Sequence, residues 1–215
     1  RDVAPSRGLG DVYKRQEYYQ KLGYALQKNK KYAEAIDAYL KADTLKPDNI
    51  WNNRHLAICY RLNRNYQAAL SYYKKVEEAT PEDTNVIFHI GSCLAELGQY
   101  EEAANYFFKL DFIESNCIKA WRGIGWCSFI SRKYEQAMKY YEKIIEQKPL
   151  AIDYMNAGHV AWTMGDIQKA AALYGKSITA NGNRERFLEM FRKDKEALLK
   201  QGIQEEDIPL MLDLL

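Results

Sequence analysis

The chain has 215 residues but no long apolar segment. No uninterrupted apolar run approaches the ~20 residues that a membrane-spanning helix needs. Residues 1–16 have no apolar core of the kind that a signal peptide contains. A Gly-rich phosphate loop with Lys and Ser or Thr is also missing, and no Ser–His–Asp or Cys–His–Asn set can be placed in order. We therefore expect neither a membrane span nor an enzyme, and no cofactor.

A strong charge of one sign is missing as well. The net charge is +2, and it comes from residues 1–16, because 27 basic and 27 acidic residues remain without them. A neutral chain gives no electrostatic reason to expect nucleic acid or an anionic membrane as partner. Hydrophobic residues make up 47% and charged residues 28%, which is typical of a soluble folded protein.

The first sixteen residues carry no periodic pattern of apolar residues. The segment Asp11–Gln16 resembles a translated transposon-end adaptor of the kind used to prepare sequencing libraries. We expect residues 1–16 to be a disordered, non-native lead that adds nothing to stability; the alternative is a natural disordered tail. The native N-terminus, with any targeting signal, would then be missing.

From Gln16 onward the sequence repeats itself with a period of 34 residues, shortened once to 33. Each unit has an apolar residue followed by a small one, then an Ala, and then an aromatic residue four positions later. The first landmark recurs as Leu22-Gly23, Leu56-Ala57, Ile90-Gly91, Ile124-Gly125 and Ala157-Gly158. The Ala is Ala35, Ala69, Ala103, Ala137 and Ala170, and the aromatic is Tyr39, Tyr73, Phe107, Tyr141 and Tyr174. Small residues at these places predict two helices that cross closely within each unit.

This pattern resembles the tetratricopeptide repeat (TPR) family, whose helix–turn–helix unit carries these residue types in this order. The resemblance implies an all-α fold, a right-handed superhelical solenoid of five units with C-terminal capping helices. We place the units over 16–49, 50–83, 84–117, 118–150 and 151–182, within an array of 17–180. Beyond them, 183–215 should hold a capping helix over 184–200, with Asn183 as its N-cap, and a short final helix. Phe187, Leu188 and Phe191 should cover the fifth unit.

The cysteines and histidines could be taken for a metal site, because His55 and Cys59, like His89 and Cys93, lie four residues apart. The repeat gives a simpler interpretation. Cys59, Cys93 and Cys127 share a position that needs a small apolar residue, and free Cys packs as one. Equivalent positions in neighbouring units are about 8–10 Å apart, too far for a shared zinc ion or a disulfide. We expect no metal site, and a cytoplasmic location is favoured over an oxidising one, although the compartment stays unknown.

In the family that this chain resembles, the first helix of each unit lines an inner groove. Carried over position by position, the resemblance implies a peptide-binding groove rich in Trp, Tyr and Arg, the residue types enriched at interfaces. Phe129 and some of the aromatic residues could instead complete the packing between repeats. The expected groove residues are Tyr24, Trp51, Arg54, Ile58, Arg61, Phe88, Lys119, Arg122, Trp126, Met155, His159 and Trp162.

We therefore expect a non-catalytic scaffold that binds a peptide segment of another protein in this groove. Two alternatives stay open: a secretion or assembly chaperone that shields an apolar client segment, and a regulatory module of a larger protein. The identity of the partner does not follow from the sequence.

Overall fold

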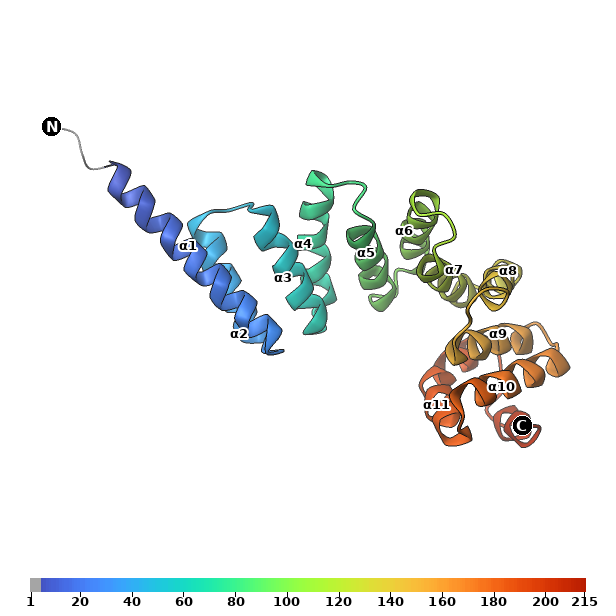
Figure 1. The fold of residues 1–215 in the computed structure, drawn as a ribbon. Helices are drawn as coiled ribbons and strands as arrows, with labels where there is room; N and C mark the ends of the chain where they lie inside the picture. Colours follow the sequence, from blue (N-terminus) through green and yellow to red (C-terminus); the bar gives the residue numbers. More distant parts are fainter. Residues whose placement is uncertain (1–4) are drawn as a thin grey trace. The chain divides into compact units, whose positions relative to one another are not determined.

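The computed structural model describes residues 5–215, which form α-helices joined by short turns (Figure 1). The chain divides into two compact units, residues 1–99 and 100–215, each of which spans more than one repeat. These two parts are called the first and the second unit, and a single helix–turn–helix motif is called a repeat. The first unit contains α1 (Pro5–Lys28), α2 (Tyr32–Leu45), α3 (Ile50–Leu62), α4 (Tyr66–Ala79) and α5 (Thr84–Glu96). The second contains α6 (Tyr100–Ile113), α7 (Ile118–Ile130), α8 (Tyr134–Ile145), α9 (Ala151–Thr163), α10 (Ile167–Asn181), α11 (Arg184–Lys200) and α12 (Asp207–Asp213).

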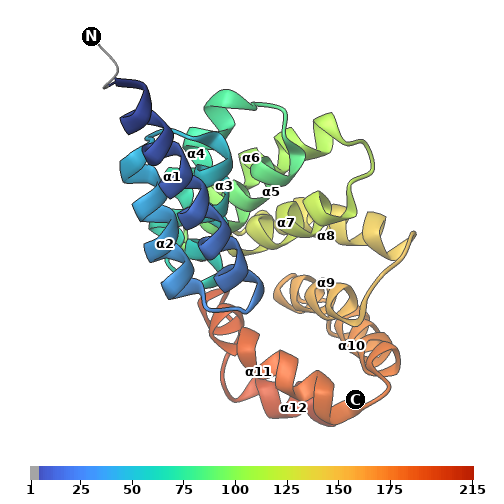
Figure 2. The same ribbon diagram turned by 60° about the vertical axis from the view of Figure 1, so that its left-hand side comes forward.

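Consecutive helices pack as antiparallel pairs within each unit. In the first unit α1 packs on α2 and α3 on α4, and α2 and α4 each contact the helix that follows (Figure 1). In the second unit α7 pairs with α8 and α9 with α10, and α11 contacts both α10 and α9 (Figure 2). The all-α helix–turn–helix fold expected from the repeats is therefore confirmed.

The repeated landmarks form the core. Each repeated Ala is fully buried, and the repeated aromatic residues are buried beside them. Gly158 shows why the small residue is needed, because a Cβ placed there would lie only 2.5 Å from the Tyr174 ring. The rings of Tyr39, Tyr141 and Tyr174 thus fill the space where the two helices of their repeat cross, and a larger residue at the glycine would separate these helices.

The turns between the two helices of each repeat share one backbone conformation that the sequence pattern does not predict. The second turn residue has positive φ in each: Lys30, Arg64, Gly98, Arg132 and Gly165. Gly adopts this conformation without strain, whereas Lys and Arg do so at some cost. Side-chain caps start two of the second helices, α4 and α10, where Asn65 accepts a hydrogen bond from the amide of Ala68 and Asp166 accepts one from the amide of Lys169.

The structure corrects the expectation of a disordered lead. Helix α1 begins at Pro5, so residues 5–16 are helical, and Gln16 is buried. Extending an existing helix adds one hydrogen bond per residue and avoids the cost of nucleation, so the glycines at positions 8 and 10 do not stop it. Residues 1–4 lie outside the described part of the chain.

Candidate peptide-binding surface

The expected groove residues lie on the first helices of the repeats. Those of the first unit are Tyr24 on α1, Trp51, Arg54, Ile58 and Arg61 on α3, and Phe88 on α5. Those of the second unit are Lys119, Arg122 and Trp126 on α7, and Met155, His159 and Trp162 on α9. The two groups belong to different units and are described separately.

Three aromatic rings cluster between α1 and α3. Trp51 and His55 have ring centroids 4.0 Å apart, and the edge of Tyr24 meets the His55 ring at 5.7 Å. Tyr24 and Trp51 are nevertheless 41% and 43% exposed. Two large rings are thus fixed by their neighbours while much of their surface remains in water, which is typical of an anchor site for a partner.

Gln27 and Tyr39 fix the orientation of the His55 ring. The amide oxygen of Gln27 accepts a hydrogen bond of 2.9 Å from the Tyr39 hydroxyl and also lies 2.9 Å from His55 Nδ1. Because that oxygen only accepts, His55 Nδ1 carries the proton in this arrangement. The imidazole also stacks on the Tyr39 ring, with centroids 5.5 Å apart. The orientation of the ring is therefore fixed before any ligand arrives.

Burial lowers the pKa of His55 to about 4, and the neighbouring charges of Arg54 and Lys28 act in the same direction. The ring is consequently neutral at pH 7. Burial also raises the pKa of Tyr39 well above its usual value, so its hydroxyl remains a donor. The cluster therefore presents neutral aromatic surface at physiological pH.

A pocket of about 570 Å³ lies beside this cluster, and its volume is within the range of about 300–1,000 Å³ that is usual for ligand sites. It is lined by Glu17, Gln20, Lys21, Tyr24, Trp51 and His55. Glu17 and Lys21 form an ion pair of 2.7 Å, and the Lys28 amine lies 5.1 Å from the centre of the Tyr24 ring. Lys28 does not line the pocket, but it adds a positive charge beside the Tyr24 ring, which does.

His55 was not among the groove residues predicted from the sequence, although its spacing from Tyr39 recurs in the next repeat. His55 follows Tyr39 by sixteen residues, and His89 follows Tyr73 by the same number. Both rings stack on the preceding aromatic residue, each with centroids 5.5 Å apart. An aromatic ring at this position thus continues the stack from one repeat to the next.

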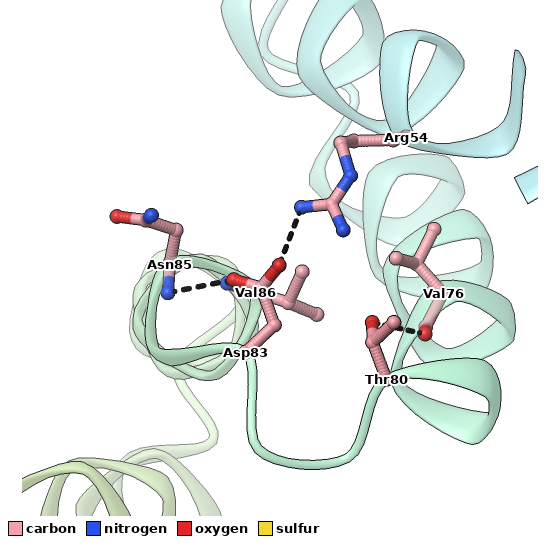
Figure 3. A network of polar contacts seen from close by, with 6 residues as sticks. All are labelled: Arg54, Val76, Thr80, Asp83, Asn85 and Val86. Atoms are coloured by element: carbon pink, nitrogen blue, oxygen red, sulfur yellow. Dashed lines mark hydrogen bonds and ion pairs between the residues drawn. The ribbon is translucent and has the colours of Figure 1, made fainter. Parts of the chain in front are cut away.

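Arg54 links two helices of the first unit. Its guanidinium forms an ion pair of 2.8 Å with Asp83 (Figure 3), which also accepts hydrogen bonds from the amides of Asn85 and Val86 at the start of α5. Burial opposes ionisation of Asp83, but the bonds from Val86 and Arg54 together lower its pKa. Arg54 therefore helps to hold α3 against α5 as well as lying on the expected surface.

The other expected residues of this unit are partly covered. Arg61 donates a hydrogen bond of 3.3 Å to the Tyr73 hydroxyl, and Ile58 and Phe88 are half-buried. The most accessible aromatic surface of the expected groove in this unit is accordingly the pair Tyr24 and Trp51.

In the second unit Arg122 is engaged by the protein itself. Its Nε and Nη2 atoms donate hydrogen bonds of 2.7 Å each to the two oxygens of Asp153, which is buried. Lys119 forms an ion pair with Glu114 at 3.3 Å. Trp126 is half-buried beside Phe129, which is fully buried as the packing interpretation expected.

The fifth repeat is covered by the C-terminal helix. Met155 and His159 are fully buried and Trp162 nearly so, and Phe191 of α11 packs against both the His159 and the Trp162 rings. The structure therefore corrects the expectation that these three side chains lie on an open groove. The capping helix was predicted to cover the fifth repeat, but because α11 lies outside the repeat register, the pattern did not show that it lies over His159 and Trp162.

The cysteines are structural in this fold. All four are buried and unpaired by disulfides. Burial raises the pKa of Cys59 and of Cys127 to about 12, and of Cys93 to about 11. Within residues 5–215 no group of three or more His, Cys, Asp or Glu side chains is placed to hold a metal ion. In the same range no helix is both long and apolar enough to cross a membrane.

Comparison with known families agrees with this architecture. Two tetratricopeptide repeat models match the chain, one over residues 61–127 and the other over residues 9–49, 118–149 and 154–184. No curated protein sequence matches it. The chain belongs to the tetratricopeptide repeat family, whose members are generally non-catalytic scaffolds for interactions with other proteins.

Solved structures share the fold at low sequence identity. The crystal structure of YrrB, described as a TPR protein with an unusual peptide-binding site, is 19% identical with a TM-score of 0.70, over 88% of this chain and 98% of YrrB. MamA from Desulfovibrio magneticus RS-1 is 15% identical with a TM-score of 0.72, over 78% of this chain and 95% of that one. A tetratricopeptide repeat protein from Parabacteroides merdae is 20% identical with a TM-score of 0.62, over 93% and 83%. At these identities the likeness concerns the fold.

Proposed function

We propose that the chain is a scaffold that binds a peptide segment of another protein through the aromatic pocket between α1 and α3. The observation that carries this proposal is the pair Tyr24 and Trp51, both more than two-fifths exposed and both fixed by His55. Fixed aromatic rings lose little conformational freedom on binding, so most of the energy of their burial is available for affinity.

The charges around the pocket define the kind of peptide that fits. A large apolar or aromatic side chain would occupy the space beside Trp51. Lys28, at the Tyr24 ring, favours an acidic residue next to that anchor, whereas Glu17 is already paired with Lys21. The preferred ligand is therefore an extended segment with a bulky apolar anchor flanked by Asp or Glu.

The structure of YrrB supports a peptide as the ligand, since that protein shares the fold and is described as having a peptide-binding site. The expected residues of the second unit are less suited to this role. Arg122 is bonded to Asp153, and the fifth repeat is covered by α11. The binding surface is therefore proposed for the first unit.

The test is a selection of random displayed peptides on the immobilised full chain, with Trp51→Ala selected in parallel. Peptides with a bulky apolar residue beside Asp or Glu should be enriched on the wild type and lost on the variant. Phe112→Ala is the matched control, because Phe112 is an exposed aromatic residue on α6 that does not line the pocket. Failure to enrich such peptides, or equal enrichment on Trp51→Ala, would contradict the proposal.

A further inference from the structure

Helix α12 is apolar on two faces. Ile208 and Met211 are buried, whereas Leu210 and Leu214 are 63% and 62% exposed and lie one turn apart on the other face. The helix is held to α11 by a hydrogen bond of 2.8 Å from Arg184 Nη2 to the carbonyl of Leu212. Two leucines this exposed, one turn apart, form an apolar face that is open to solvent in the described part of the chain.

A groove of about 490 Å³ runs beside this face. The buried side chains Trp162 and Met211 line it, together with the exposed Ile167, Leu210 and Leu214. Its volume lies within the range of about 300–1,000 Å³ that is usual for ligand sites. The groove thus has room for at least one large apolar side chain of a partner.

The remaining lining of the groove is acidic. Asp207 and Asp213, at the two ends of α12, complete it, and none of the described residues that line the groove is Lys or Arg. Carboxylates around an apolar surface attract a partner with basic residues and repel an acidic one.

We propose that this groove is a second docking site, which takes an apolar side chain of a partner protein segment flanked by Lys or Arg. A segment of this kind buries Leu210 and Leu214 and places cations beside Asp207 and Asp213. Its charge preference is the opposite of that of the pocket between α1 and α3, so the two sites select different segments.

Two other occupants fit the charges less well. A second copy that docked through the same groove would bring its own Asp207 and Asp213 against these, and like charges oppose such a contact. The negative surface of an anionic membrane would be repelled in the same way. A basic, amphipathic segment satisfies both the apolar and the charged part of the site.

The experiment uses two short fluorescent peptides that have Leu at the same positions. The remaining positions are Lys in the Leu/Lys peptide and Glu in the Leu/Glu peptide. Anisotropy titrations with the full chain should give at least about tenfold tighter binding of the Leu/Lys peptide. The double variant Leu210→Gln/Leu214→Gln should weaken that binding by about tenfold or more without a change in charge. Asp207→Asn/Asp213→Asn should weaken it most at low salt.

The matched control is Phe112→Gln/Ile113→Gln, which removes two exposed apolar side chains from α6 and should leave the affinity unchanged. Circular dichroism melts on the same samples show whether each variant is folded. Trp51→Ala should also bind the Leu/Lys peptide normally, which separates this site from the pocket of the first unit. The proposal would be overturned by equal affinity for both peptides or by unchanged affinity of the Leu210→Gln/Leu214→Gln variant. It would also be overturned if the wild type formed a dimer and this variant were a monomer.

Discussion

Arg122 and Asp153 form a two-bond ion pair between α7 and α9, with both N–O distances at 2.7 Å. The Asp153 carboxylate also accepts a hydrogen bond of 2.7 Å from the Leu150 amide, so it caps α9 and ties that helix to α7. Burial of the carboxylate makes the pair part of the core of the second unit.

Removal of Arg122 should therefore destabilise the fold. Arg122→Met leaves the Asp153 carboxylate buried without its cation, which commonly costs about 3 kcal/mol. Urea unfolding followed by circular dichroism measures the loss. Arg54→Met is the comparison, because the more exposed pair with Asp83 should contribute about 1 kcal/mol or less. Equal effects of the two changes would show that the Arg122 pair is not a core element.

Stability should fall as the pH decreases from 6.5 toward 4. The pKa of His55 is lowered to about 4 in the folded chain, so between these values the unfolded chain binds a proton that the folded chain does not. The stabilisation is complete above pH 6.5 and is lost through this window. Melting temperatures at pH 7 and pH 5 should differ less in His55→Gln than in the wild type. An identical drop in both would contradict the role assigned to His55.

Two glycine substitutions should act in opposite directions. The Cβ of Gly158→Ala would lie 2.5 Å from the buried Tyr174 ring, and such overpacking typically costs about 1–3 kcal/mol. Gly175→Ala, on the next helix, meets nothing within 4 Å and should stabilise α10 by about 0.5–1 kcal/mol. Thermal melts of both variants provide the test, and a destabilised Gly175→Ala would show that the space beside it is used.

The cysteines should not react in the folded chain. The thiols of Cys59 and Cys127 are buried, and burial raises the pKa of each to about 12, so little thiolate forms at pH 8. A colorimetric thiol reagent should label all four cysteines in denaturant and almost none under native conditions. Rapid labelling of the native chain would show that a cysteine is accessible or that a repeat opens readily.

The core of this protein could be predicted from the sequence, because each core position recurs in every repeat. Tyr39 and Tyr174, far apart in the chain, are both fully buried for the same reason. Sequence periodicity is a direct consequence of units that each bury the same face against the next.

It was harder to predict which side chains stay available for a partner, because this depends on contacts with residues that occur in one repeat only. Asp153 has no counterpart in the other repeats, so nothing in the pattern showed that it would bind Arg122. The sequence predicted that Phe191 of the capping helix covers the fifth repeat, but α11 lies outside the register, so the pattern did not show that Phe191 packs on His159 and Trp162. The role of His55 could have been found, since its spacing from Tyr39 is repeated by His89 and Tyr73.

The central claim is that Trp51 anchors a peptide on the first unit, and calorimetry tests it most directly. A selected peptide with a bulky apolar residue beside Asp or Glu is titrated into the wild type, Trp51→Ala, Phe112→Ala and Trp121→Ala. Trp121 is buried and its indole donates a hydrogen bond to Asp111, so Trp121→Ala should lower the free energy of unfolding by about 3–5 kcal/mol. Trp51→Ala should lower the affinity by about thirtyfold or more while its melting curve stays close to that of the wild type. The claim would be contradicted if Trp51→Ala kept the wild-type affinity, or if its melting temperature fell as far as that of Trp121→Ala.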